Sequence, residues 1–113
     1  MYLKDYVGAM NSKTIIKKYF DGWVRDDKDK VRFYLADGLK FRSPEENYDS
    51  ADSFIEACWK HAEKMPRFDV IHEVYDNDGG YVVYSTGGFV SGELLKIRNG
   101  KIYEIYVTFH PTH

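Results

Sequence analysis

The spacing of apolar residues changes at Phe68, and that change narrows the possible folds. Before Phe68, apolar residues mostly recur every three or four positions, as they do on one face of an α-helix. From Phe68 to His110, apolar and polar residues mostly alternate, as they do in strands with one buried face. Helices followed by strands predict an α+β domain, in which the helices pack on one face of an antiparallel sheet.

Three helices are predicted in the first part of the chain. The first begins at the N-cap residue Ser12 and ends where the charged run Asp26–Lys30 interrupts it. A short second helix covers residues 31–35. The third lies between a capping residue at position 49 or 50 and Pro66, which ends it. Its apolar stripe includes Trp59.

A short strand is predicted between the second and third helices. Leu39, Phe41 and Ser43 alternate with charged residues and therefore share the inner face of this strand, which Pro44 ends.

Three further strands are predicted over residues 68–75, 81–97 and 101–110. Three glycines between positions 87 and 92 lie inside the second of these, where glycines mark bulges or sharp bends. We therefore expect a strongly curved antiparallel sheet, which the helices close into a cone-shaped hollow.

The last hairpin has two candidate registers. A two-residue loop of Asn99 and Gly100 would place Glu93 opposite Tyr106, whereas a three-residue loop would pair Glu93 with Ile105. The second register gives the more apolar inner face, and we adopt it. It directs the Glu93 carboxyl inward among the apolar residues Phe89, Leu95, Ile97, Tyr103, Ile105, Val107 and Phe109.

The composition narrows the class of protein. The 113 residues suit one domain, which we place at residues 11–113 after an N-terminal arm of residues 1–10. A net charge of −2 argues against nucleic acid, and no apolar run approaches the ~20 residues of a membrane span. The single cysteine, Cys58, favours a reducing cytoplasm. Since no metal-binding or phosphate-binding motif is present, we predict no metal site and no cofactor.

Two stretches, FYLADGLKFRSP (residues 33–44) and RNGKIYEIYVTFHP (residues 98–111), carry a family resemblance. In their order and spacing the chain resembles the nuclear transport factor 2-like superfamily, which includes ketosteroid isomerases and SnoaL-type polyketide cyclases. The resemblance covers roughly residues 12–111. It implies a cystatin-like cone in which helices and a curved sheet enclose a pocket.

The resemblance to ketosteroid isomerases can be followed residue by residue. Tyr19 falls on the tyrosine that holds an oxyanion, and Glu93 falls on the second oxyanion donor, a carboxylic acid kept protonated. Phe109 falls on a pocket tryptophan. Ser43 falls on the aspartate base, and an unassisted serine hydroxyl is not a base at neutral pH.

Each of these residues also has a purely structural interpretation. Tyr19 can be a core tyrosine with a backbone partner, Ser43 a turn residue, and Glu93 the partner of Tyr19. His72 shares its predicted face with Phe68, so it is either a core histidine or a base that replaces the missing aspartate. We predict that His72 and Glu93 face the same cavity.

The sequence therefore predicts a pocket for an apolar small molecule that bears a carbonyl or hydroxyl group. Isomerase or lyase chemistry is expected from Tyr19, His72 and Glu93; the alternative is a non-catalytic homodimeric binding or protein-interaction module. The predicted ligand-binding residues are Trp23, Phe41, Ser43, Trp59, Val107 and Phe109. We expect a homodimer through the outer face of the sheet, at Leu94, Ile102, Tyr106 and Thr108.

Overall fold

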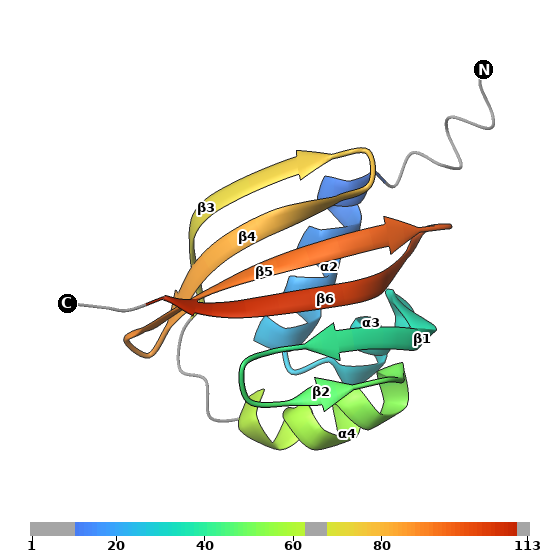
Figure 1. The fold of residues 1–113 in the computed structure, drawn as a ribbon, viewed down its shortest axis with the longest axis horizontal. Coiled ribbons are helices and arrows are strands. Elements are labelled where there is room, and N and C mark those ends of the chain that lie inside the picture. The colour runs from blue at the N-terminus through green and yellow to red at the C-terminus, as the bar shows by residue number, and fades with distance from the viewer. Residues whose placement is uncertain (1–10, 63–67, 111–113) are drawn as a thin grey trace.

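A curved six-stranded sheet in the order β2-β1-β6-β5-β4-β3 carries the described helices on its concave face (Figure 1). The computed structural model describes residues 11–62 and 68–110, so the predicted arm at residues 1–10 and the predicted helix end at Pro66 lie outside the described residues. The helices are α2 (Ser12–Val24), α3 (Lys28–Phe33) and α4 (Ala51–Ala62). The strands are β1 (Leu35–Arg42), β2 (Asn47–Tyr48), β3 (Asp69–Asp76), β4 (Gly79–Thr86), β5 (Phe89–Arg98) and β6 (Lys101–His110). The predicted α+β class is confirmed, but the sheet is not purely antiparallel, because β1 pairs with β6 in parallel.

The first two helices begin at side-chain caps. The N-cap of α2 is Asn11, one residue before the predicted Ser12, and its side-chain oxygen accepts a hydrogen bond from the Thr14 N–H at 2.9 Å. Asp27 caps α3 in the same way and accepts from the Lys30 N–H at 3.1 Å. The charged run that ends α2 therefore also supplies the N-cap of α3. As a result α3 begins at Lys28, three residues before the predicted start.

The close approach of α2 and α3 depends on a glycine. A Cβ atom on Gly22 would lie 2.7 Å from Cγ2 of Val31, which is fully buried. Gly22 therefore weakens α2 by propensity but lets the two helices pack.

The predicted long strand over residues 81–97 is two strands. Gly87 and Gly88 have φ values of 54° and 93°, in the left-handed region that favours glycine, and form the turn between β4 and β5.

The register of the β5–β6 hairpin differs from both predicted alternatives. Arg98 pairs with Lys101 around a two-residue Asn99-Gly100 loop, and both loop residues have positive φ. A bulge then inserts one extra residue, Tyr103, into β6. Glu93 consequently lies opposite Val107.

The bulge in β6 also changes which side chains are buried. Ile102, which we predicted on the outer face, is 0% exposed and packs in the core beside Ile105. On β5, independently of this bulge, the predicted inner residue Phe89 is 76% exposed.

A second bulge, at Ile71 in β3, reverses the faces of that strand. Val70 pairs with Tyr84 before the bulge, and His72 pairs with Val83 after it. The next residue, Glu73, then faces α2 and forms an ion pair with Lys17 at 3.6 Å. His72 lies on the outer face and is exposed.

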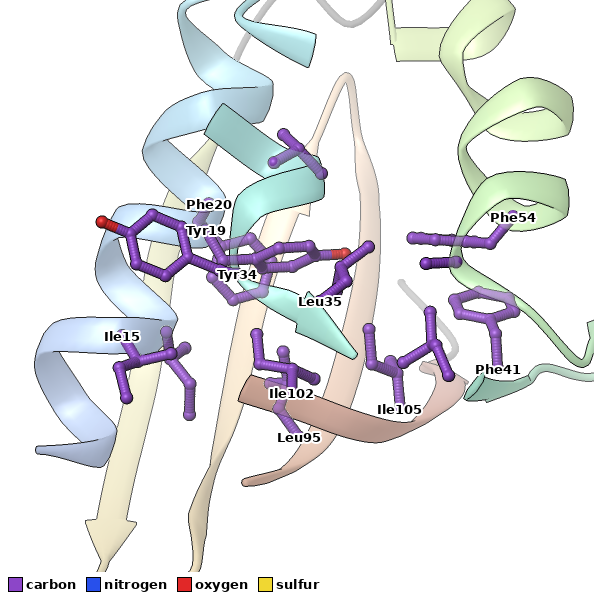
Figure 2. Close-up of a cluster of buried hydrophobic side chains, with 14 of the residues drawn as sticks. Ile15, Tyr19, Phe20, Tyr34, Leu35, Phe41, Phe54, Leu95, Ile102 and Ile105 are labelled. Carbon is purple, nitrogen blue, oxygen red and sulfur yellow. The ribbon is translucent and has the colours of Figure 1, made fainter. Parts of the chain in front are cut away.

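The core lies between the concave face of the sheet and the helices (Figure 2). Phe41 of β1 stacks on Phe54 of α4 with ring centroids 4.5 Å apart, which anchors that helix to the sheet. Within the described residues, no helix is long and apolar enough to span a bilayer. The fully buried side chains of the core include Ile15, Ile16, Tyr19, Val31, Leu35, Leu39, Leu95, Ile102 and Ile105.

Candidate functional site

A cavity of about 310 Å³ lies between α2, α4 and the concave face of the sheet. Its walls are mainly aromatic, with Val107 on β6 completing the apolar part. The polar lining residues are Ser43, Glu45, Glu46, Cys58, Thr86, Ser91 and Glu93. The aromatic lining residues are Tyr19, Phe20, Trp23, Phe41, Phe54, Phe68, Tyr84 and Phe109.

The aromatic wall is held by ring-to-ring contacts. Phe68 packs between Phe20 and Tyr84, with centroid distances of 5.0 and 4.7 Å. Trp59, predicted to bind ligand, does not line the cavity; it packs behind the lining residue Trp23 with centroids 4.7 Å apart. The one-sided stripe of α4 directs Trp59 toward α2, so Trp59 supports the wall.

Glu93 is a buried carboxyl at the inner face of β5, and it is only 7% exposed. The Tyr84 hydroxyl donates a hydrogen bond to its Oε2 atom. Its Oε1 atom has no hydrogen-bond partner within the described part of the chain. Burial raises the pKa of Glu93 to about 7, although the hydrogen bond from Tyr84 acts in the opposite direction. Both protonation states are therefore accessible near neutral pH.

Tyr84 is a site residue that the sequence analysis missed. It pairs with Ser91 while Val82 pairs with Glu93, so Tyr84 and Glu93 are diagonal neighbours on the inner face. Strand alternation alone places Tyr84 on the same face as Val82, but the β4–β5 register was needed to bring it to Glu93. Burial, and then the charge of Glu93, raises the pKa of Tyr84, so its hydroxyl keeps its proton.

Tyr19 lines the cavity from α2 and is 2% exposed. Its pKa is raised well above the usual value, first by burial and then by the negative charge of Glu93. Tyr19 is thus both a core residue and a protonated hydroxyl in the vicinity of Glu93.

Ser43 lies at the edge of the cavity, but the β1–β2 turn uses its hydroxyl. The Ser43 hydroxyl donates to the Glu46 carbonyl oxygen at 2.9 Å and accepts from the Glu46 N–H, also at 2.9 Å. The Glu45 N–H donates to the same hydroxyl at 3.3 Å. These bonds give Ser43 the turn role, and they bring two glutamates to the lining of the cavity.

His72 does not lie in the cavity. It is exposed and absent from the lining, because the β3 bulge turns it to the outer face. The prediction that His72 and Glu93 share one cavity is therefore wrong.

The remaining lining residues carry little chemistry of their own. Burial, and then the charges of Glu46 and Glu93, raise the pKa of Cys58 to about 12, so it is a neutral thiol. Phe109 is 51% exposed and lies at the open side. Among the described residues, no three His, Cys, Asp or Glu side chains are grouped closely enough to hold a metal ion.

The outer face of the sheet presents a row of directly opposed side chains. Val74 pairs with Tyr81, Tyr81 with Leu94, and Leu94 with Tyr106. Val74, Leu94 and Tyr106 are 65%, 40% and 38% exposed. This apolar row crosses four strands.

Comparisons with known proteins identify the fold. No family model matches the chain, and neither does any curated protein sequence. A crystal structure from Kribbella flavida superposes with a TM-score of 0.83 at 19% identity, covering 91% of this chain and 89% of that one. A nuclear transport factor 2-like protein of unknown function from Burkholderia xenovorans gives a TM-score of 0.78 at 16% identity, with coverages of 89% and 84%.

A third structure is a candidate isomerase of the SnoaL-like family from Agrobacterium tumefaciens. It gives a TM-score of 0.73 at 11% identity, and the alignment covers 88% of this chain and 97% of that one. At these identities the likeness concerns the fold, and the predicted resemblance is confirmed at that level. The chain has the nuclear transport factor 2-like fold, the cystatin-like cone shared with SnoaL-like proteins.

Proposed function

We propose that this domain binds a small, largely apolar molecule in the aromatic cavity, with a carbonyl or hydroxyl oxygen of the ligand against Glu93. The observation that carries the proposal is the Oε1 atom of Glu93, which is buried and has no partner among the described residues. Leaving such an atom unpaired costs about 1–3 kcal/mol. A ligand group bonded to the Glu93 carboxyl would remove that cost.

The chemistry we propose for the site is of the isomerase or lyase type: enolisation, cyclisation or dehydration. Protonated Glu93 can donate to a ligand oxygen, and Tyr19 keeps its hydroxyl proton because its pKa is raised. Donors fixed around one oxygen stabilise the negative charge that develops there during enolisation.

A proton acceptor is also required, and Ser43 and His72 do not supply it. The Ser43 hydroxyl belongs to the turn, and His72 lies on the outer face. Glu45 and Glu46 also line the cavity, two and three residues beyond the position where the resemblance expects an aspartate. Catalysis in this cavity would use one of these carboxylates as the base.

Thermal unfolding against a panel of ketones, phenols, steroids and polyketide-like aromatics tests the proposal. A ligand at 100 times its dissociation constant adds about 2.7 kcal/mol, which raises the melting temperature by several degrees in a domain of this size. Glu93→Leu removes both hydrogen-bonding oxygens at similar volume and should abolish the shift. Glu56→Gln, at an exposed position on α4, is the control and should retain it.

The second candidate is a non-catalytic homodimeric binding module, and the outer row of Val74, Tyr81, Leu94 and Tyr106 favours it. If no compound in the panel shifts the wild type, the cavity has no ligand of this class and the module becomes the better account. For either function we propose a cytoplasmic location, in keeping with the single cysteine, Cys58, which stays a thiol.

A further inference from the structure

The charged side chains in the described lining of the cavity are all acidic. Glu45, Glu46 and Glu93 all line it, and no lysine, arginine or histidine does so among the described residues. Carboxylates around a cavity with low-dielectric walls attract cations and repel anions. The cavity therefore disfavours carboxylate or phosphate ligands.

The walls add a second attraction for cations. The rings of Phe20, Trp23, Phe68 and Tyr84 surround the space in front of the sheet. The face of an aromatic ring attracts an ammonium group by its quadrupole, most strongly where water is excluded. Aromatic walls and a carboxylate together form the chemical environment of an ammonium site.

The free oxygen of Glu93 supplies the directional contact. Tyr84 already bonds to Oε2, whereas Oε1 is buried and has no partner in the described part of the chain. When Glu93 is ionised, both of its oxygens are acceptors only. The ligand group that then suits Oε1 is a donor, and a charged N–H donor makes the stronger bond.

We infer that the cavity also binds amines that carry an aromatic or alicyclic ring, with the ligand's ammonium group donating to Oε1 of Glu93. This inference rests on the proposed small-molecule binding and adds a second ligand class. The protonated form of Glu93 selects a carbonyl or hydroxyl compound, and the ionised form selects the amine.

Among the described residues that line the cavity, Glu93 has its pKa raised to near neutrality. The titratable groups around it are Tyr84 from β4, Tyr19 from α2 and Cys58 from α4, and all three have raised pKa values, so they stay neutral. The pKa of Glu93 itself is about 7. An alkylammonium keeps its charge in the same range, so the pH dependence of amine binding would report the ionisation of Glu93.

Isothermal titration with a matched pair of probes tests the inference: 2-(2-naphthyl)ethylamine and 2-(2-naphthyl)ethanol, at pH 6 and pH 8. Since the ionised fraction of a group with a pKa of about 7 rises from about a tenth to about nine-tenths between these values, amine affinity should rise about tenfold. The affinity of the alcohol should stay level or fall.

Two variants distinguish a direct contact between Glu93 and the ammonium group from the general effect of negative charge on the protein. Glu93→Gln keeps a neutral hydrogen-bonding side chain but removes the charge, so it should abolish the rise of amine affinity with pH. Glu56→Gln removes the same charge from an exposed position of α4 that does not line the cavity, and it should preserve the rise.

The outcomes distinguish the two proposals. Binding of the alcohol without the amine, or amine binding that Glu93→Gln leaves unchanged, overturns the amine inference and leaves the proposed function standing. If neither probe binds at either pH, the amine inference is overturned; the proposed function is overturned only if the panel of ketones, phenols, steroids and polyketide-like aromatics also gives no shift.

Discussion

The hydroxyl of Tyr84 donates a hydrogen bond to the buried carboxyl of Glu93 from the neighbouring strand. The two residues sit diagonally across the β4–β5 pair, with Ser91 and Val82 as their direct partners. This bond satisfies one carboxyl oxygen, while the other is buried and has no partner among the described residues. Glu93 itself belongs to the lining of the aromatic cavity. The stability and the binding behaviour of the domain both depend on the protonation of this pair.

The stability of the protein should fall as the pH rises from 5 to 8. The pKa of Glu93 is raised from 4.5 to about 7 on folding, so between these values the folded protein holds a proton that the unfolded chain has lost. The full loss, about 3 kcal/mol, is reached above pH 7. Urea unfolding of the wild type and Glu93→Gln at several pH values measures this loss of stability. The stability of the variant should not fall in this way between pH 5 and pH 8. An equal fall in the two proteins would contradict the prediction.

Tyr84→Phe should raise the pKa of Glu93 further, because the hydrogen bond from Tyr84 lowers it in the wild type. We expect a stability loss of about 1–2 kcal/mol, because the buried carboxyl would lose the hydrogen bond from Tyr84. The carbon-13 shift of the Glu93 carboxyl across a pH titration reads the change directly.

Tyr106→Phe is the matched control for that variant. Its hydroxyl donates to Glu104 at 3.0 Å, but both residues are at the outer face and Tyr106 is 38% exposed. The change should stay within about 0.5 kcal/mol. Equal losses of stability in Tyr84→Phe and Tyr106→Phe would show that burial does not strengthen the contribution of the Tyr84–Glu93 hydrogen bond.

Gly22→Ala should destabilise the protein although alanine favours helices by about 1 kcal/mol. The new Cβ would lie 2.7 Å from Val31 Cγ2 and 3.0 Å from the Val31 backbone nitrogen. Forcing such contacts apart costs about 1–3 kcal/mol. Gly38→Ala is the control, since nothing lies within 4 Å of its Cβ position. In thermal unfolding, the melting temperature of Gly22→Ala should be clearly lower than that of Gly38→Ala.

The proposed homodimer should depend on the outer apolar row. Light scattering after size exclusion should give about twice the chain mass of 13.3 kDa for the wild type and a monomer for Leu94→Arg. Val24→Arg places the same charge at an apolar residue of α2 that is 59% exposed, and it should leave the dimer intact. A wild-type protein that is monomeric at micromolar concentration would contradict the proposed homodimer.

The helices and the general course of the sheet were predictable because each depends on local pattern. The stripe of α2, with Ile15, Ile16 and Tyr19, places its buried face correctly. The inward position of Glu93 was also predicted correctly, although the register used to reach it was wrong. Alternation within β5 already puts Glu93 on the face of the buried residue Leu95, whatever strand lies opposite.

The two bulges could not be predicted. Ile71 and Tyr103 are ordinary strand residues, and an extra residue in a strand leaves no mark on composition. Each bulge reverses the alternation on one side of itself. That single geometric cause accounts for the wrong faces assigned to His72 and Ile102.

The parallel pairing of β1 with β6 decides when the sheet can be completed during synthesis. β6 lies between β1 and β5, so the β2-β1 pair has no hydrogen-bonded strand neighbour on its other side until residues 101–110 leave the ribosome. Until then β1 and β5 each present an open edge to other chains. Val107 lies on the same strand, so the wall of the cavity forms only at that late step. A nascent chain stalled before Lys101 would thus hold two separate half-sheets with open edges and an incomplete cavity wall.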